Sequence, residues 1–259
     1  MAVPDADIFP HATAEAEKTV AQHQEPQDLV FYAGWFCPFV QRSWIALEEK
    51  GIPYQYKEVN PYHKEKEFLD INPKGLVPAL VYKGKPLYES LIISEFLEDA
   101  YPSYTPHLLP TDPFARAHAR LWTDYVAKNV VPANQRLVQA QEPERRAAAL
   151  QELIGALKTV AAEKAKAPGP YFLGEEWSLV DTALAPWVVR DYVVRENRGF
   201  RREDVGEEWV QYAHALETRP SVLKTQSDRK HLEPIYGRYL RDEAQSEAAK
   251  ATRAGRSFS

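Results

Sequence analysis

The chain has 259 residues, with 32 Lys or Arg against 37 Asp or Glu, so its formal net charge is −5. This length suits one large or two medium domains, and the mild acidity excludes the concentrated basic face of a nucleic-acid-binding protein. The chain contains no run of about 18 apolar residues, which excludes an ordinary membrane-spanning helix. Its N-terminal stretch carries Asp5, Asp7, Glu15 and Glu17, so we expect no secretory signal.

Cys37 is the single cysteine of the chain. It cannot form an intramolecular disulfide, and a cysteine-rich metal site is excluded, so we predict no metal centre. A lone thiol fits a reducing compartment, and we therefore expect a cytoplasmic protein.

The first half of the chain alternates between strand and helix patterns. Residues 1–27 form a polar extension with weak structural signals. The predicted order is then strand, helix, strand, short helix, a two-stranded hairpin and a helix. These elements cover residues 29–32, 38–50, 54–59, 65–70, 77–81, 86–88 and 89–97. The first three make a right-handed βαβ unit, in which Pro38 opens the helix and Gly51 ends it.

The second half shows helical patterns and no convincing strand. Prolines at positions 102, 106, 110 and 113 mark a linker. Helices are expected over residues 114–139, 144–166, 207–217 and 221–226, after Gly174, and near 235–240. Residues 242–259 form a small-residue, polar tail that we expect to be disordered. The sequence thus predicts an α/β plus all-α fold, with an α/β domain over 28–103 and an all-helical domain over 113–241.

Cys37 follows the first strand and precedes Pro38, at the first turn of a helix. The positive end of the helix dipole and the N–H groups of that turn stabilise a thiolate and lower the thiol pKa. The alternative is a small buried packing residue, but the position favours a reactive thiol. Since Val40 stands three residues on, the chain has no second thiol there, and the resolving thiol must come from outside.

Five further residues suggest a ligand site. Pro78 interrupts a predicted strand, where it cannot donate a hydrogen bond. A cis Val77–Pro78 bond would expose the Val77 backbone to a peptide-like ligand, whereas an edge-strand or turn proline is the alternative. Glu89 and Ser90 either cap a helix or hold the charged ends of an amino-acid-like ligand. Lys64 is either a solvated surface lysine or a similar ligand residue.

The helical half offers one capping motif and one set of aromatic residues. Ser178 and Asp181 fit a capping box, which we interpret as structural. Aromatic residues at helical spacing are commonly core residues, but they could also line an acceptor pocket. The candidates for that pocket are Trp122, Tyr125, Trp187, Arg190 and Tyr192.

Taken together, these motifs resemble those of the cytosolic glutathione transferases, and of the Omega class in particular. The resemblance runs from about Leu29 to Tyr239. It rests on Phe36-Cys37-Pro38-Phe39, Lys64, Asn72-Pro73-x-Gly75-x-Val77-Pro78, Tyr88-Glu89-Ser90 and Ser178-x-x-Asp181. Residues 193–208, which include four arginines, are longer and more charged than the class pattern, so the resemblance leaves the acceptor substrate undetermined.

The resemblance implies a thioredoxin-like, glutathione-binding domain over 28–103 and a helical, substrate-binding domain over 113–241, commonly in a homodimer. It implies that Cys37 forms a mixed disulfide with glutathione, the co-substrate. Around it, Val77, before a cis Pro78, would pair with the cysteinyl backbone. Glu89 and Ser90 would hold the γ-glutamyl end, Lys64 the glycyl carboxylate, and Phe39 would wall the site.

The leading hypothesis is a glutathione-dependent thiol transferase, or deglutathionylating reductase, with dehydroascorbate reduction as a related activity. Its substrate would be a small hydrophobic or glutathionylated compound, with no nucleic-acid or membrane partner. Three alternatives stand beside it: a glutathione-conjugating transferase, a non-enzymatic carrier of aromatic metabolites, and an intracellular chloride-channel protein. The last shares the motif from Cys37 to Arg42, but the charges at 48–50 and 57–58 interrupt any apolar segment.

Overall fold

The computed structural model describes residues 8–63 and 65–256. The chain divides into two compact units, each described separately below. Unit 1 takes the residues up to Leu108 together with Arg219–Leu232, and unit 2 takes Leu109–Thr218 together with the residues from Glu233 onward. Unit 1 has a thioredoxin-like fold and unit 2 is helical, as the sequence predicts.

Unit 1 is built on a four-stranded mixed sheet in the order β2-β1-β3-β4. The central strand β1 pairs in parallel with β2 and antiparallel with β3, and β3 forms a hairpin with β4. The four strands are β1 (Leu29–Ala33), β2 (Gln55–Glu58), β3 (Ala79–Tyr82) and β4 (Lys85–Tyr88). The prediction of a strand from residue 77 is wrong by two residues, because the proline at position 78 has no N–H to donate to a ladder.

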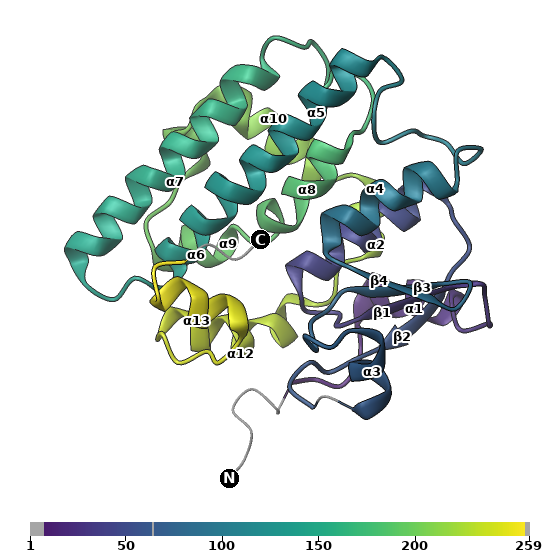
Figure 1. The fold of residues 1–259 in the computed structure, drawn as a ribbon. Helices are drawn as coiled ribbons and strands as arrows, with labels where there is room; N and C mark the ends of the chain where they lie inside the picture. Colours follow the sequence, from purple (N-terminus) through teal and green to yellow (C-terminus); the bar gives the residue numbers. More distant parts are fainter. Residues whose placement is uncertain (1–7, 64, 257–259) are drawn as a thin grey trace. The chain divides into compact units, whose positions relative to one another are not determined.

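Helices cover both faces of this sheet. Figure 1 shows α2 (Pro38–Lys50) and α4 (Ser90–Ala100) on one side and α3 (Lys66–Ile71) on the other. Alternate residues of β1 are fully buried, which follows from the two-residue period of a strand. Phe31 packs near Tyr54 and Tyr56 on one face, while Tyr32 faces Phe68 of α3 on the other. Gly51 ends α2 with φ +64°, as predicted.

The expectation of weak structure over residues 1–27 is wrong for α1 (Ala14–Gln22). This helix packs against α11 (Pro220–Lys224), which itself packs against α2. The Thr19 hydroxyl donates to the Lys224 carbonyl at 2.8 Å, and the Thr13 N–H donates to the Ser227 hydroxyl at 3.1 Å. Contacts across more than 200 residues therefore stabilise a helix whose local sequence predicts little.

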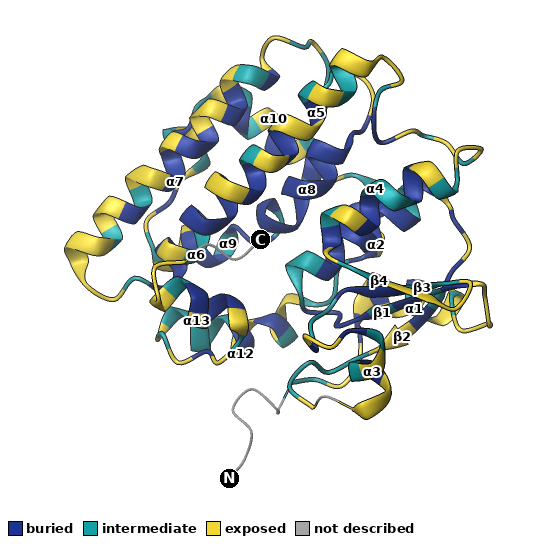
Figure 2. Cartoon of the chain, in the orientation of Figure 1, coloured by how far each residue is buried: buried dark blue, intermediate teal, exposed yellow. Residues whose placement is uncertain are grey.

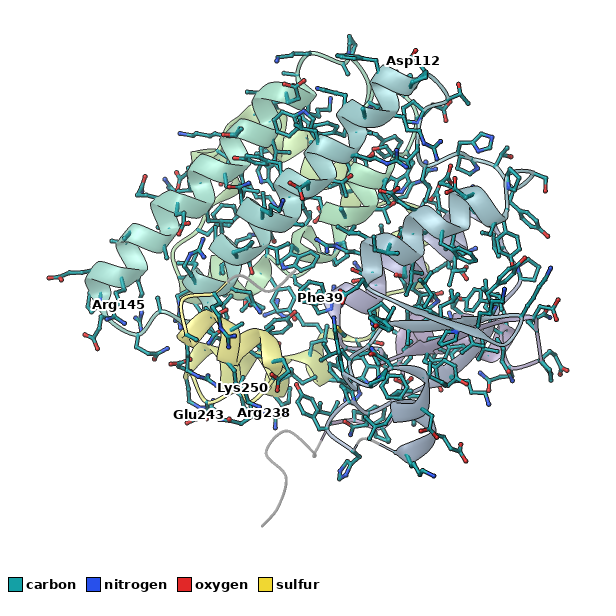
Figure 3. All side chains as sticks on the ribbon, in the orientation of Figure 1. Phe39, Asp112, Arg145, Arg238, Glu243 and Lys250 are labelled. Atoms are coloured by element: carbon teal, nitrogen blue, oxygen red, sulfur yellow. The ribbon has the colours of Figure 1, made fainter. Side chains whose placement is uncertain are left out.

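Unit 2 begins with one long helical run over 113–139, close to the predicted helix over 114–139. It consists of α5 (Pro113–Tyr125), a π-helical turn η1 (Val126–Val130) and α6 (Val131–Gln139). The Asp112 carboxylate, labelled in Figure 3, caps α5 by accepting from the Ala115 N–H at 2.8 Å. The π-helical turn ends two residues before Pro132, which cannot donate an intrahelical hydrogen bond.

The core of unit 2 surrounds α8 (Leu179–Val188), which is buried along its whole length (Figure 2). Its N-terminus carries the predicted capping box: the Ser178 N–H donates to Asp181 Oδ2 at 2.8 Å. The Phe172 N–H and the Tyr212 hydroxyl both donate to Asp181 Oδ1, at 2.9 and 2.7 Å. The structural interpretation of this motif is confirmed. α8 packs against α5, η1 and α10 (Glu207–Glu217). The unit also contains α7 (Pro143–Lys164), α9 (Tyr192–Asn197) and the 3₁₀ turn η2 (Arg202–Asp204).

The expectation of a disordered tail is wrong for α13 (Glu247–Arg253), which follows α12 (Arg229–Leu240). Three alanines of α13, at positions 248, 249 and 251, are buried, and α13 packs against α6. Small residues favour this packing because they let two helix backbones approach closely. Among the described residues, no helix combines the length and apolar character needed to cross a membrane.

Candidate functional site

Three segments leave the sheet of unit 1 at the same end. Tyr32, near the end of β1, pairs with Ala79 at the start of β3, and Ala79 pairs with Tyr88 at the end of β4. The segments just beyond these three residues therefore lie close together. They carry the predicted site residues Cys37, Phe39, Val77, Pro78, Glu89 and Ser90.

Cys37 occupies the N-cap position of α2 and is half-buried. Its N–H donates to the Gly34 carbonyl at 2.9 Å, and its own carbonyl accepts from the Gln41 N–H at 3.1 Å. The first bond closes the loop after β1, and the second is the first hydrogen bond of the helix. The thiol thus sits where the helix dipole favours an anion. The half-buried Phe39 stands in the first turn of α2 (Figure 3).

Arg42 is a charged residue that the sequence analysis did not assign. It is fully buried in α2, and its guanidinium carbon lies 5.5 Å from the centre of the Phe39 ring. Burial lowers the pKa of Arg42 to about 9, while the charge of the Cys37 thiolate acts in the opposite direction. The same attraction must favour the thiolate, because the interaction between two charges is reciprocal.

The loop before Cys37 is fixed from two sides. The Trp35 N–H donates to Glu58 Oε1 at 3.1 Å, and the Tyr56 hydroxyl donates to Glu58 Oε2 at 3.2 Å. The Trp35 indole N–H donates to the Phe9 carbonyl at 2.8 Å. Residues of β2 and of the N-terminal segment therefore position the loop that carries the thiol.

The Val77–Pro78 peptide bond is cis, the geometry that the resemblance implies. Pro78 is buried and Val77 is half-buried. The turn before them is fixed by the buried Asn72, whose side-chain amide donates to the Leu76 carbonyl at 2.8 Å. The cis peptide thus lies between a fixed turn and the start of β3.

Glu89 and Ser90 stand at the N-terminus of α4 and differ in exposure. Glu89 is exposed, has φ +76° and forms an ion pair of 2.8 Å with Lys74. Ser90 is buried, and its carbonyl accepts from the Ser43 hydroxyl of α2 at 3.1 Å. This bond ties the start of α4 to the helix that carries Cys37. Lys64, the remaining predicted ligand residue of this unit, lies outside the described residues.

The acceptor candidates of unit 2 fall into separate environments. Trp122 is buried and its ring lies 5.2 Å from that of Tyr125 and 5.5 Å from that of Phe172. Trp187 instead lines a cavity of about 20 Å³, whose other lining residues include neither Trp122 nor Tyr125. Arg190 is buried and donates to the Pro186 carbonyl at 2.9 Å, which fixes it to its own helical segment. The half-buried Tyr192 belongs to α9.

The arginines over residues 193–208 have structural contacts. Arg202 binds Asp191 at 2.6 Å and Glu217 at 2.7 Å. Arg198 donates to the carbonyls of Val138 and Leu240, at 2.8 and 2.7 Å. The charge of this region thus serves to join helices of unit 2.

The sequence analysis did not assign two residues of the candidate site, Arg42 and Lys74. Arg42 stands between Gln41 and Ser43, so its local sequence gave no signal of burial, and only the structure shows it to be fully buried. Lys74 gave no local signal, since its partner Glu89 lies 15 residues away. Over residues 8–63 and 65–256, no group of three or more His, Cys, Asp or Glu side chains is arranged to hold a metal ion.

Comparison with known proteins agrees with this geometry. The family profile "Glutathione S-transferase, N-terminal domain" matches residues 36–100. The probable glutathione S-transferase parC of Nicotiana tabacum is 34% identical over 204 residues, which cover 78% of this chain and 91% of the relative. Glutathione S-transferase U25 of Arabidopsis thaliana is 39% identical over 151 residues, covering 58% of this chain and 66% of the relative.

Two solved structures extend the comparison. The crystal structure of glutathione transferase Omega 3C from Trametes versicolor has a TM-score of 0.82 at 66% identity, over 84% of this chain and 97% of that chain. Rice GST1 (OsGSTU1), solved in complex with glutathione, has a TM-score of 0.74 at 33% identity, over 82% of this chain and 97% of that chain. The resemblance inferred from the motifs is confirmed, and the chain belongs to the glutathione transferase family.

Proposed function

We propose that this glutathione transferase is an Omega-type thiol transferase that acts through a mixed disulfide on Cys37. The observation that carries the proposal is the place of the thiol: the chain's single cysteine caps α2 at the sheet end where Val77, Glu89 and Ser90 also lie. The 66% identity with an Omega transferase supports the class. The rice relative solved with glutathione supports the co-substrate.

The reaction takes two thiol–disulfide exchanges. The Cys37 thiolate attacks the glutathionyl sulfur of a glutathionylated substrate, a new S–S bond forms, and the substrate leaves as a thiolate that takes a proton from water. The thiolate of free glutathione then attacks the mixed disulfide, releases glutathione disulfide and restores the Cys37 thiolate. Each turnover thus consumes one free glutathione, which leaves as glutathione disulfide together with the glutathionyl group removed from the substrate. Dehydroascorbate carries no glutathionyl group, so its reduction would consume two free glutathione molecules, whose thiols supply the two electrons and leave as glutathione disulfide.

The proposal also assigns each part of glutathione to residues of the candidate site. The Val77 backbone would pair with the cysteinyl residue of glutathione, beside the buried Pro78. Glu89 and Ser90 would hold the γ-glutamyl end at the N-terminus of α4, where N–H groups and the helix dipole favour a carboxylate. Phe39 would wall the site beside Cys37, and Lys64 would bind the glycyl carboxylate.

Glutathione conjugation is the second candidate, and the sequence relatives favour it. A Tau-class transferase from mango and the rice GSTU1 structure share this fold at 27% and 33% identity. Conjugation would require the bound glutathione to keep its thiol free, so that this thiol can attack an electrophile. A cysteine at position 37 is instead suited to attack the glutathionyl sulfur of an existing disulfide, which is why thiol transfer is the primary proposal.

Mass spectrometry after incubation with glutathione disulfide tests the proposal directly. The wild type should gain one glutathione adduct on Cys37, which free glutathione removes, while Cys37→Ser should gain none. Thiol-transfer activity should fall by at least about a hundredfold in Cys37→Ser, because the nucleophile is lost. A Cys37→Ser variant with full thiol-transfer activity would refute the mechanism. A Cys37→Ser variant that gained conjugating activity would favour glutathione conjugation, the second candidate.

The proposal extends to assembly and location. Phe114 and Leu121 of α5 are 81% and 60% exposed, and Ile92 of α4 is 54% exposed. Large apolar side chains of this kind mark interaction surfaces, and a second copy of this chain is the proposed occupant. We also propose a cytoplasmic location, because the reaction depends on reduced glutathione and a free thiol persists in a reducing compartment. The unit 2 residues Trp122, Tyr125, Trp187 and Arg190 stay candidates for contact with the acceptor substrate.

A further inference from the structure

Lys74 lies in a turn whose backbone is held rigidly. Its N–H donates to Asn72 Oδ1 at 3.1 Å, and the Gly75 N–H donates to the Asn72 carbonyl at 2.7 Å. Gly75 takes φ +62°, a conformation that glycine adopts without steric penalty. The same turn leads directly into Val77–Pro78. The position of the Lys74 backbone is therefore set by the structure that forms the proposed glutathione site.

The Lys74 side chain reaches the segment that would bind the γ-glutamyl end. Its Nζ donates to Glu89 Oε1 at 2.8 Å and lies 5.3 Å from the centre of the Tyr88 ring. The Glu89 hydrogen bond and charge raise the pKa of Lys74, so the ammonium is charged at neutral pH. The two side chains are 56% and 44% exposed. An ion pair this exposed contributes little to stability, so it can exchange its partners for those of a ligand.

The γ-glutamyl end of glutathione carries an ammonium and a carboxylate on the same carbon atom. Glu89 can accept a hydrogen bond from the ammonium but repels the carboxylate. A cation within reach of Glu89 resolves this conflict, because the four charges then alternate in sign. Lys74 is such a cation, and its turn and the Tyr88 ring hold it beside Glu89. A lysine suits the role because its ammonium is a compact charge on a flexible chain.

We propose that Lys74 is a specificity-determining residue that binds the α-carboxylate of the γ-glutamyl group, while Glu89 binds the neighbouring ammonium. The inference rests on the proposed function, since it assigns one more contact to the same glutathione site. It makes the protein selective for thiols that carry a free α-amino-acid group over peptides that lack either charge.

Binding of three S-methylated peptides tests the role of Lys74 by isothermal titration calorimetry. S-methylation prevents exchange with Cys37. The peptides are S-methylglutathione, its analogue with a 4-aminobutyryl group, which lacks the α-carboxylate, and its analogue with a glutaryl group, which lacks the α-amino group. The variant is Lys74→Gln. The matched control is Lys85→Gln, which removes the same charge from an exposed position at the opposite end of β4.

The wild type and Lys85→Gln should bind S-methylglutathione about tenfold more tightly than the 4-aminobutyryl peptide, as expected for one charge-assisted hydrogen bond. In Lys74→Gln this preference should shrink to the part that the N–H groups at the start of α4 supply, about threefold or less. This variant should still prefer S-methylglutathione over the glutaryl peptide, because Glu89 is intact. If Lys74→Gln keeps the tenfold preference, the role of Lys74 is contradicted and the proposed function is not affected. A wild type that binds none of the peptides contradicts the proposed function and the Lys74 role with it.

Discussion

At the residue scale, the reactivity of Cys37 depends on two sources of positive potential. One is the N-terminus of α2, which the thiol caps, and the other is the buried guanidinium of Arg42 in the same helix. The dipole acts on any cysteine at this position, whereas the guanidinium contributes only because an arginine stands at position 42. A charge so fully removed from water interacts more strongly than the same charge on the surface.

Replacing Arg42 should therefore make Cys37 a weaker nucleophile. Arg42→Met keeps the length of the side chain but removes its charge, so the pKa of the thiol should rise and the thiol-transfer rate at pH 7 should fall by up to roughly tenfold. Absorbance at 240 nm against pH reports the thiolate without interference, because the chain has one cysteine. Arg42→Lys, which keeps the charge, serves as the control. An unchanged thiolate titration in Arg42→Met would show that the helix dipole acts alone.

At the element scale, α1 is held in unit 1 by a cluster at its C-terminal end. The His23 ring stacks on Tyr54 at 3.8 Å between centres, and its nitrogens lie 3.1 Å from the Tyr54 carbonyl and 3.2 Å from Glu48 Oε1. Burial raises the pKa of Glu48, but hydrogen bonds from His23 and Tyr54, with the charges of His23 and Lys224, outweigh burial and hold it below the usual value.

The Glu48 contribution to stability should depend on pH in a defined direction. Because its pKa is lower in the folded chain, the contribution is full above the unfolded value of 4.5 and is lost as the pH falls through the lowered folded value. His23→Phe keeps the stacked ring but removes the hydrogen bond to Glu48. It should reduce the unfolding free energy by about 1 kcal/mol at pH 7, and by less once Glu48 is protonated.

Urea denaturation of His23→Phe and of the wild type, from pH 7 down to pH 3, measures this difference. The control is Lys18→Gln, which removes an exposed ion pair with Glu15 from the same helix and should stay within about 0.5 kcal/mol of the wild type. A difference that stays constant over the whole range would show that Glu48 does not mediate the effect of His23.

At the scale of the whole molecule, the exposed side chains of α5 bear on assembly. Phe114 and Leu121 lie seven residues apart, which places them on the same face of the helix, and both are largely exposed. If a second copy covers them, Phe114→Glu combined with Leu121→Glu should convert the dimer into a monomer, because each buried carboxylate would lack a partner.

Sedimentation at micromolar concentration distinguishes the two states. Leu223→Glu is the matched control: Leu223 is 43% exposed on α11, and its replacement should leave the dimer intact. A wild type that sediments as a monomer, or a double variant that remains dimeric, would contradict the assembly proposed here.

The local sequence determined the order of elements from β1 to α4, the capped start of α8 and the place of the thiol. A short apolar run predicted the strand around Phe31, and alternation predicted the strand around Tyr56. Proline and glycine marked the ends of α2, and the Ser178–Asp181 spacing marked the start of α8. These features depend on residues within a few positions of one another, so a single sequence carries the whole signal. The family resemblance follows from the same local motifs in their order.

Only the tertiary structure decided the features that rest on distant contacts. It buried Arg42, docked α1 against residues 219–232, packed α13 against α6 and brought Lys74 to Glu89. It also placed Trp187 in a cavity that Trp122 does not line. Burial and pairing of this kind are set by residues from other elements, and the free energy of a helix such as α1 comes mainly from the surface it covers rather than from its own propensity.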